Sequence, residues 1–269
     1  MTTESAAVPA AAAESATGPA GPALARYVLA LGDDALVRCQ RLCSWITRAP
    51  TIEEDLALSN IALDLLGHAR ALLDHAGRLD GTGRDAEHLA YRRTAREFRN
   101  VLLVELPDRD FAAAVVRQLA HSQYTVLLYR ALAGSTDPEL AAIAARAAAE
   151  SAYHRTHAAA WTVRLGRGTA ESRARTAAAL EELWPYTGEL FEEDEEVAGL
   201  AAAGLAVAPS ALREEWRRET GAVLAEAGLP VPRPRWTATG GRSGLHTEVL
   251  EPLVAELQSV HRQYPGGTW

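Results

Sequence analysis

Apolar residues recur along much of the chain at alternating steps of four and three, the spacing that places side chains on one face of an α-helix. The clearest example lies between Pro50 and Asp80. One apolar stripe in this stretch is formed by Leu58, Ala62, Leu65, Ala69, Leu72, Ala76 and Leu79. Thr51 and Glu54 have the spacing of a capping box. The pattern therefore predicts a central helix of about eight turns that begins near Thr51.

Similar patterns, separated by Gly and Pro, predict the other helices. They are expected over Leu24–Arg48, Phe111–Ala133, Pro138–Leu165, Thr169–Leu183, Ala211–Ala227 and Leu245–Tyr264. Runs of β-branched and aromatic residues of strand length are nearly absent, which favours an all-α protein. Long helices joined by short turns indicate a ferritin-like four-helix bundle with a helical C-terminal extension.

The composition of each segment suggests how the chain is divided. Residues 1–22 consist mainly of Ala, Ser, Thr, Pro and Gly and are expected to form a disordered leader. Residues 23–269 are expected to form one ferritin-like helical domain. Within it, the core bundle is predicted over about residues 24–166 and the C-terminal helices over about residues 169–264.

Charge and hydropathy exclude several classes of function. The chain has 27 basic and 35 acidic residues, and no basic cluster that would follow a nucleic-acid backbone. No apolar run approaches the ~20 residues of a membrane span, and no secretion signal is recognisable. We therefore predict a cytoplasmic protein without a nucleic-acid or membrane partner.

Cys39 and Cys43 are interpreted as reduced core thiols. The acidic run Glu189–Glu196 is interpreted as a solvated face, with docking of a basic partner as the alternative.

Polar residues in the middle of the predicted helices provide the candidate chemistry. A ferritin-like di-iron site needs a Glu from each of two helices and a Glu-x-x-His pair from each of the other two. Leu65 stands three residues before His68, and Ser151 stands three residues before His154. The predicted helix Phe111–Ala133 contains no Asp or Glu at all. A four-carboxylate site therefore cannot be assembled from these helices, and we assign no catalytic or cofactor-binding residue.

Two acid–histidine pairs in these helices are spaced by four residues instead of three. Residues four apart share a helix face, so each pair can form a hydrogen bond. We interpret them as internal polar bonding or surface pairing. The alternative is an irregular or vestigial metal site. Its ligands would be Asp34, Asp64, His68, Glu150 and His154.

Six segments, taken in order from about residue 30 to the C-terminus, resemble a known family. They are LGDDALVRCQRL, APTIEEDLALSNIALDLLGHAR, EFRNVLLVELPDRDFAAAVVRQ, ESAYHRTHAAAWTVRLGRGTAES, LWPYTGELF and GLHTEVLEPLVAELQSVHRQYPGGTW. The family is that of the PaaC subunit of the bacterial phenylacetyl-CoA epoxidase, an enzyme also called phenylacetate-CoA oxygenase. This chain departs from it in having His68 where the family more often shows Gln.

The resemblance implies a ferritin-like fold and a role in aerobic phenylacetate catabolism. In this family, the PaaC subunit pairs with a related catalytic protein that holds the di-iron centre. The complex uses O2, with electrons from NADPH delivered by a reductase subunit, to convert phenylacetyl-CoA into a ring 1,2-epoxide. The PaaC subunit is regarded as structural. The resemblance thus implies a non-catalytic subunit of a monooxygenase, with no cofactor of its own and with the other epoxidase subunits as partners.

Three hypotheses follow from these observations. The first is a non-catalytic partner subunit of a heteromeric complex, and the second is a metal-dependent oxidase or oxygenase in its own right. The third is a helical interaction module unrelated to oxygenases. Ile61, Leu63 and Leu66 lie off the apolar stripe of the central helix. For the first hypothesis, we expect an interface on the two predicted helices between Leu24 and Leu79.

Overall fold

The computed structural model describes residues 21–267, and within that range every regular element is helical. The four longest helices are α1 (Gly21–Cys43), α2 (Ile52–Leu79), α5 (Phe111–Leu132) and α6 (Pro138–Arg167). The shorter α-helices are α3 (Ala86–Tyr91), α4 (Leu102–Glu105), α7 (Ala170–Leu183), α8 (Glu195–Ala202), α9 (Arg213–Ala227), α10 (Leu250–Leu257) and α11 (Ser259–Gln263). Short 3-10 helices are η1 (Ala95–Glu97), η2 (Trp184–Phe191), η3 (Pro209–Leu212) and η4 (Gly241–Ser243).

Helix α2 forms as its sequence predicts. The Thr51 side chain accepts a hydrogen bond from the Glu54 backbone N–H, 3.4 Å away, and so caps the first turn. Glu53, Glu54 and Asp55 place negative charge in that turn, where the helix dipole favours it. All seven residues of the predicted apolar stripe are buried. The central helix and its core-facing side are therefore confirmed.

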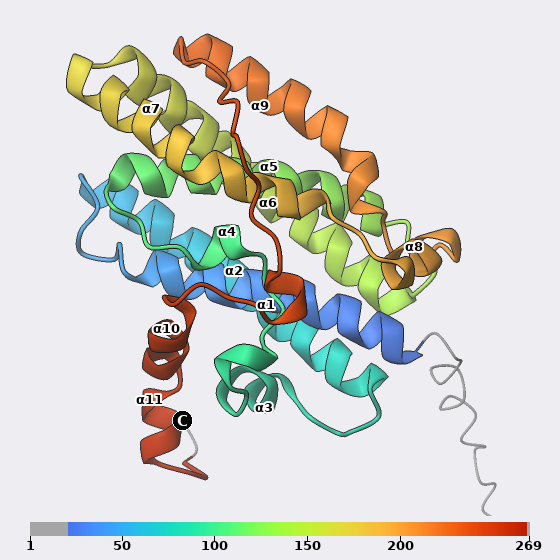
Figure 1. The fold of residues 1–269 in the computed structure, drawn as a ribbon. Coiled ribbons are helices and arrows are strands. Elements are labelled where there is room, and N and C mark those ends of the chain that lie inside the picture. The colour runs from blue at the N-terminus through green and yellow to red at the C-terminus, as the bar shows by residue number, and fades with distance from the viewer. Residues whose placement is uncertain (1–20, 268–269) are drawn as a thin grey trace, which may run out of the picture.

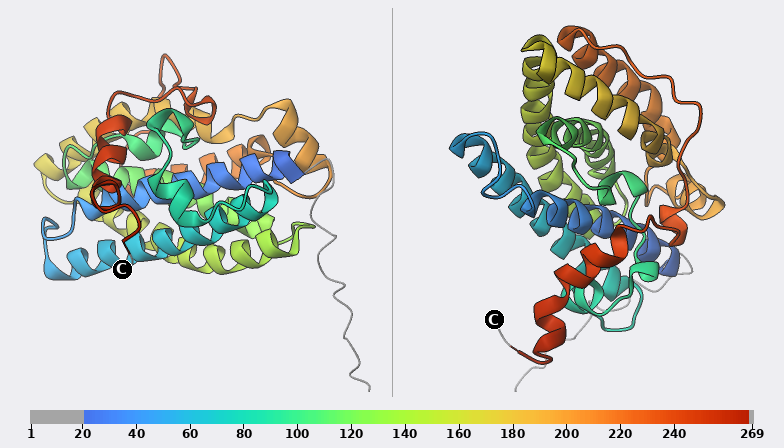
Figure 2. Two further views of the ribbon diagram at one scale, coloured as in Figure 1. Left: turned by 90° about the horizontal axis from the view of Figure 1, so that it is seen from below. Right: turned by 60° about the vertical axis from the view of Figure 1, so that its left-hand side comes forward.

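The long helices form two hairpins that face each other (Figure 1). Helix α1 packs along α2, and α5 packs along α6. The connection that carries α3, η1 and α4 leads from the first hairpin to the second, and α2 and α6 then meet along a shared seam. Helices α7 and α9 pack on α5 and α6, whereas α10 and α11 lie at the other side of the molecule (Figure 2). The prediction of an all-α, ferritin-like fold is confirmed.

Both ends of the predicted domain need correction. The predicted leader lies outside the described residues, except for Gly21 and Pro22, which form the first turn of α1. Helix α1 ends at Cys43 instead of continuing to Arg48. The last predicted helix is wrong over its first residues, because α10 begins only at Leu250 and a second helix, α11, follows it. Before α10, Gly244 has a left-handed backbone (φ 80°), which ends the preceding 3-10 helix η4.

Two smaller predictions are also corrected. Cys39 and Cys43 are both free thiols, but only Cys39 is buried, because Cys43 lies at the exposed end of α1. The acidic run is not uniformly solvated. Glu189 is buried and accepts hydrogen bonds from the backbone N–H groups of Leu102 and Gly241, both at 2.7 Å. The residues from Glu192 to Glu195 are exposed, as predicted.

One helix in the described range, α2, is long and apolar enough by length and composition to cross a membrane. The core helix of a soluble protein passes the same test when one of its faces packs inside the fold. Helix α2 has such a face, since its apolar stripe packs against α1, and it also carries the buried histidines His68 and His75.

Candidate functional site

The seam between α2 and α6 brings together four of the five residues of the predicted alternative site. Nε2 of His68 lies 2.5 Å from Oε2 of Glu150. Nε2 of His154 lies 2.9 Å from Oδ2 of Asp64. Both imidazoles are buried, whereas both carboxylates are half-buried at the outer edge of the seam. Two acid–histidine pairs therefore link one hairpin of the bundle to the other.

These pairs are crossed between the helices and are not formed within them, which corrects the sequence-based pairing. On α2, His68 follows Asp64 by four residues. On α6, their partners occur in the reverse order, because Glu150, the partner of His68, precedes His154, the partner of Asp64, by four residues. Two antiparallel helices in register produce this pattern, because each turn of one faces one turn of the other. The spacing of four was a valid sign of one polar face, but the partners lie across the seam.

Further acid–histidine contacts lie toward both ends of the seam. Nε2 of His157 is 2.7 Å from Oε2 of Glu54, and Nε2 of His75 is 3.0 Å from Oδ1 of Asp137. Tyr153 stands beside the His154 ring, with the two ring centroids 6.3 Å apart. The seam is therefore held along its length by hydrogen bonds between imidazoles and carboxylates.

Burial determines the charge state of the two central pairs. It lowers the pKa of His68 and of His154 below the ordinary value, even though Glu150 and Asp64 act in the opposite direction. Burial alone would raise the pKa of Glu150, but hydrogen bonds from His68 and Arg146 outweigh it and lower that pKa. The His68–Glu150 contact is thus a neutral imidazole that donates its Nε2–H to a carboxylate. Nδ1 of His68 is buried and has no hydrogen-bond partner within residues 21–267.

Asp34, the fifth predicted residue, is engaged elsewhere. Its Oδ2 accepts a hydrogen bond from Nη2 of Arg242 at 2.6 Å, and its Oδ1 accepts one from the Val101 backbone N–H at 2.8 Å. Arg242 also donates to the carbonyl oxygens of Ala30 and Arg99. This carboxylate of α1 is therefore bound to a guanidinium, as is that of its neighbour Asp33, which accepts hydrogen bonds from Arg93.

The side of the bundle interior formed by α1 and α5 carries a cation. Arg38 is fully buried, and its Nε donates to Oε1 of Gln118 at 3.0 Å. Its Nη2 donates to the carbonyl oxygen of Ala114 at 3.3 Å. His121, one turn further along α5, is also buried, and its Nε2 has no partner among the described residues. Burial and the charge of Arg38 lower the pKa of His121 to about 3.

This donor set does not fit a di-iron pair. Two iron ions need several anionic oxygen ligands to balance their charge in an interior of low polarity. Here both carboxylates of α1 are bound to arginines and Arg38 is buried beside them, whereas α5 offers no carboxylate. Over residues 21–267, no group of three or more His, Cys, Asp and Glu side chains is arranged to hold a metal ion.

Several polar residues that organise the interior were not recognised from the sequence. Glu105 accepts hydrogen bonds from Nδ1 of His246 at 2.8 Å and from the Thr247 backbone N–H and hydroxyl at 2.7 Å. The prediction that His246 and Thr247 begin the last helix is wrong, since both precede α10. Gln258 likewise donates to the carbonyl oxygens of Ala90 and Arg93. These contacts join segments more than 140 residues apart, and no local pattern marks them.

Comparison with known proteins gives the context for this site. Residues 1–269 match the family described as phenylacetic acid catabolic protein. The chain belongs to this family. It is also 46% identical over 246 residues to the C subunit of 1,2-phenylacetyl-CoA epoxidase of Escherichia coli (strain K12), a match that covers 91% of this chain and 99% of that protein. The resemblance found in the sequence segments is therefore confirmed. In the bundle of this chain, the central histidines and carboxylates form hydrogen bonds with one another.

Proposed function

We propose that this chain is the non-catalytic structural subunit of a multicomponent phenylacetyl-CoA 1,2-epoxidase, a monooxygenase of aerobic phenylacetate catabolism. It pairs with the protein that carries the di-iron centre and stabilises it. The other subunits of the complex, including the reductase that delivers electrons from NADPH, are further partners. We expect the complex to be cytoplasmic, and this chain to contain no cofactor.

The proposal rests mainly on the hydrogen bonds and ion pairs that occupy the polar residues inside the bundle. The carboxylates of Asp64 and Glu150 bind histidines across the seam, and that of Asp34 binds Arg242. Arg38 adds a fixed positive charge to the same interior. A dication brought into this site would have to break those hydrogen bonds and would meet the buried positive charge of Arg38, which shares the carboxylate of Asp108 with Arg117. The similarity to an epoxidase subunit then supports a scaffold better than an independent enzyme.

A second observation supports assembly with a partner. The outer face of α2 is apolar and exposed: Leu56 is 60% exposed and Leu63 is 64% exposed. Ile52 and Leu66 extend the same face. Ile61 was expected to belong to it, but it is buried, because α2 packs against α1, α3 and α6 at once. The large apolar residues of α1 are buried or half-buried, so the proposed interface lies on α2 alone.

The test combines metal analysis with assembly. The chain is expressed alone in iron-supplemented medium, and iron is measured per chain. It is then co-expressed with the di-iron subunit, and the mass of the purified assembly is measured by light scattering. We expect no stoichiometric iron in the isolated chain and a stable heteromer. About two irons per chain, together with oxygenase activity, would support an enzyme in its own right. Separate elution of the two chains at micromolar concentration would refute the scaffold.

A further inference from the structure

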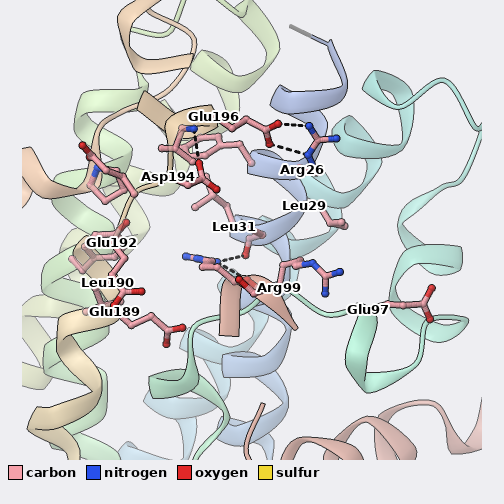
Figure 3. Close-up of a pocket in the computed structure, with 18 residues that line it drawn as sticks. Arg26, Leu29, Leu31, Glu97, Arg99, Glu189, Leu190, Glu192, Asp194 and Glu196 are labelled. Atoms are coloured by element: carbon pink, nitrogen blue, oxygen red, sulfur yellow. Dashed lines mark hydrogen bonds and ion pairs between the residues drawn. The ribbon is translucent and has the colours of Figure 1, made fainter. Parts of the chain in front are cut away.

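A cavity of about 380 Å³ lies near the N-terminal half of α1, away from the α2–α6 seam. The α1 residues on its wall include Tyr27, Leu29 and Leu31. The segment from Glu189 to Glu196 lines the opposite side, and Arg99 and Arg242 complete the wall (Figure 3). Small-molecule sites in proteins have volumes of about 300–1,000 Å³ and combine apolar walls with a few polar groups. The cavity therefore has the size and the mixed lining of a ligand site.

The positive charges around the cavity are already bound. Arg26 forms a two-pronged ion pair with Glu196, visible in Figure 3. Arg99 donates from Nη1 to the carbonyl oxygens of Arg96 and Phe98. Arg242 donates to Asp34 and to two backbone carbonyl oxygens. These guanidinium groups hold the wall together, and an anionic ligand would have to compete for them.

The carboxylates of the segment before α8 have only neutral hydrogen-bond partners among the described residues. Glu192 accepts a hydrogen bond from the Thr239 hydroxyl, and Glu193 accepts one from Ser210. Asp194 caps α8 by accepting from the Val197 backbone N–H. None of these three forms an ion pair with another residue of the described chain, 21–267. These three exposed carboxylates therefore give this side of the cavity an excess of negative charge that no ion pair balances.

Tyr124 adds an unpaired hydrogen-bonding group to the wall of the cavity. It lies on α5, is 2% exposed and lines the cavity. Its ring packs against Phe191, but its hydroxyl has no hydrogen-bond partner within the described residues. Because Tyr124 lines the cavity, a ligand bound there can donate a hydrogen bond to this oxygen. An N–H group is a suitable donor, and the acidic rim favours one that carries positive charge.

We propose that this cavity binds an organic cation, an ammonium or guanidinium group on an apolar stem. The stem packs on Leu29 and Leu31, a donor N–H bonds to the Tyr124 hydroxyl, and Glu192, Glu193 and Asp194 supply the counter-charge. This site is separate from the α2–α6 seam and does not rest on the proposed function. The cation has two possible sources: a free amine or guanidine compound, or a Lys or Arg side chain of a partner protein.

The experiment titrates the purified chain with n-butylguanidinium and with n-butylurea, its neutral counterpart, by NMR chemical-shift changes. We expect saturable binding of the cation with a dissociation constant below about 1 mM, weaker binding at high salt, and at least tenfold weaker binding of the urea. Tyr124→Phe should weaken cation binding threefold to tenfold. The triple variant Glu192→Gln, Glu193→Gln, Asp194→Asn should weaken it at least tenfold, and Asn preserves the cap of α8.

The matched control neutralises three exposed carboxylates on α9, in the variant Glu214→Gln, Glu215→Gln, Glu226→Gln, and should leave binding unchanged. Repeating the titration on the assembled complex separates the two sources. Loss of probe binding there assigns the cavity to a partner side chain, and unchanged binding assigns it to a free cation. The proposal is overturned if the probe does not saturate, if n-butylurea binds equally well, or if the cavity triple variant behaves as the control.

Discussion

His154 and Asp64 are partners in one hydrogen bond, but they are buried to different degrees. The His154 side chain is 1% exposed, whereas that of Asp64 is 33% exposed. A carboxylate that loses its partner at this edge can still be hydrated, but a buried imidazole cannot. Removing Asp64 and removing His154 should therefore lower the free energy of unfolding by different amounts. A polar group without a hydrogen-bond partner destabilises the fold only where water cannot reach it.

Asp64→Ala should lower the free energy of unfolding by about 1–3 kcal/mol, since it leaves the buried Nε2–H of His154 without an acceptor. Thermal or urea unfolding measures this effect, and Glu226→Ala, which removes an exposed carboxylate on α9, is the control. Activity of the reconstituted complex should be unchanged at a temperature where the variant stays folded. A hundredfold loss of activity with unaltered unfolding would point to chemistry at the seam instead.

The pH dependence of stability should reflect His121. Its pKa of about 3 in the folded protein lies below the usual histidine value of about 6.5, so the unfolded chain binds more protons between these values. The stabilising contribution is fully present above pH 6.5 and is lost as the pH falls toward 3. The slope is on the order of 1.4 kcal/mol per pH unit for one such group. His68 and His154 act in the same direction.

Urea unfolding measured between pH 4 and 7 tests this expectation. His121→Leu should flatten the dependence of the unfolding free energy on pH, because the variant has no proton to take up on unfolding at this position. His88→Leu, at an exposed position on α3, serves as the control. An equal slope in wild type and His121→Leu would contradict a neutral, buried His121.

Elements with a local signal were the predictable part of the fold. The stripe of α2 and its Thr51 cap depend on residues within one turn of each other, and both were confirmed. The last predicted helix failed because His246 and Thr247 are bound by Glu105, a residue on a different element. The crossed pairs of the seam were missed for the same reason. The spacing of four indicated the polar face, but only the packing of α2 against α6 decides the partners.

The outer face of α2 allows a test of the interface. Leu63→Glu should leave the monomer folded, because Leu63 is exposed, and should weaken the heteromer by several kcal/mol if the residue lies near the centre of the contact. Light scattering of co-expressed subunits measures the assembly, and Leu66→Glu repeats the test on the same face. Ala222→Glu, at an exposed position on α9, is the control. Unchanged assembly in both Leu variants would place the interface on another face.

Gly67 offers a more specific test of that face. A Cβ atom at this position would meet nothing within 4 Å in the chain itself, so the fold does not require glycine there. Gly67→Ala should stabilise the isolated chain by roughly 0.5–1 kcal/mol through helix propensity. It should also weaken the heteromer if a partner helix approaches closely. Gly199→Ala on α8, where a Cβ is equally unobstructed, should not affect assembly. Tighter assembly of Gly67→Ala would exclude close approach.

At the scale of the whole molecule, the C-terminal segment completes the interior. Arg242 reaches Asp34 on α1, His246 reaches Glu105, and Gln258 reaches the α3 region. These roles could not be predicted from local patterns, because each partner is distant along the chain. Composition predicted the fold class, but it could not predict which of the residues near the C-terminus return to the core.

Arg242→Ala should lower the unfolding free energy by roughly 3 kcal/mol, because it leaves the buried Asp34 carboxylate without its guanidinium. Adding Asp34→Asn should recover part of that loss, since the uncompensated charge is then absent. Arg235→Ala, at an exposed position in the same segment, should have little effect. Equal unfolding curves for Arg242→Ala and wild type would show that the ion pair contributes nothing to the fold.

The pairing of Asp34 with Arg242 also bears on how the protein is made. The two residues are separated by 208 positions, so a chain growing on the ribosome exposes the acid long before its basic partner is synthesised. The hairpin of α1 and α2 can form early, but its ionic interior closes only after Arg242 has left the ribosome. We therefore expect products that end before Arg242 to leave Asp34 without its ionic partner and to be degraded more readily than the longer chain.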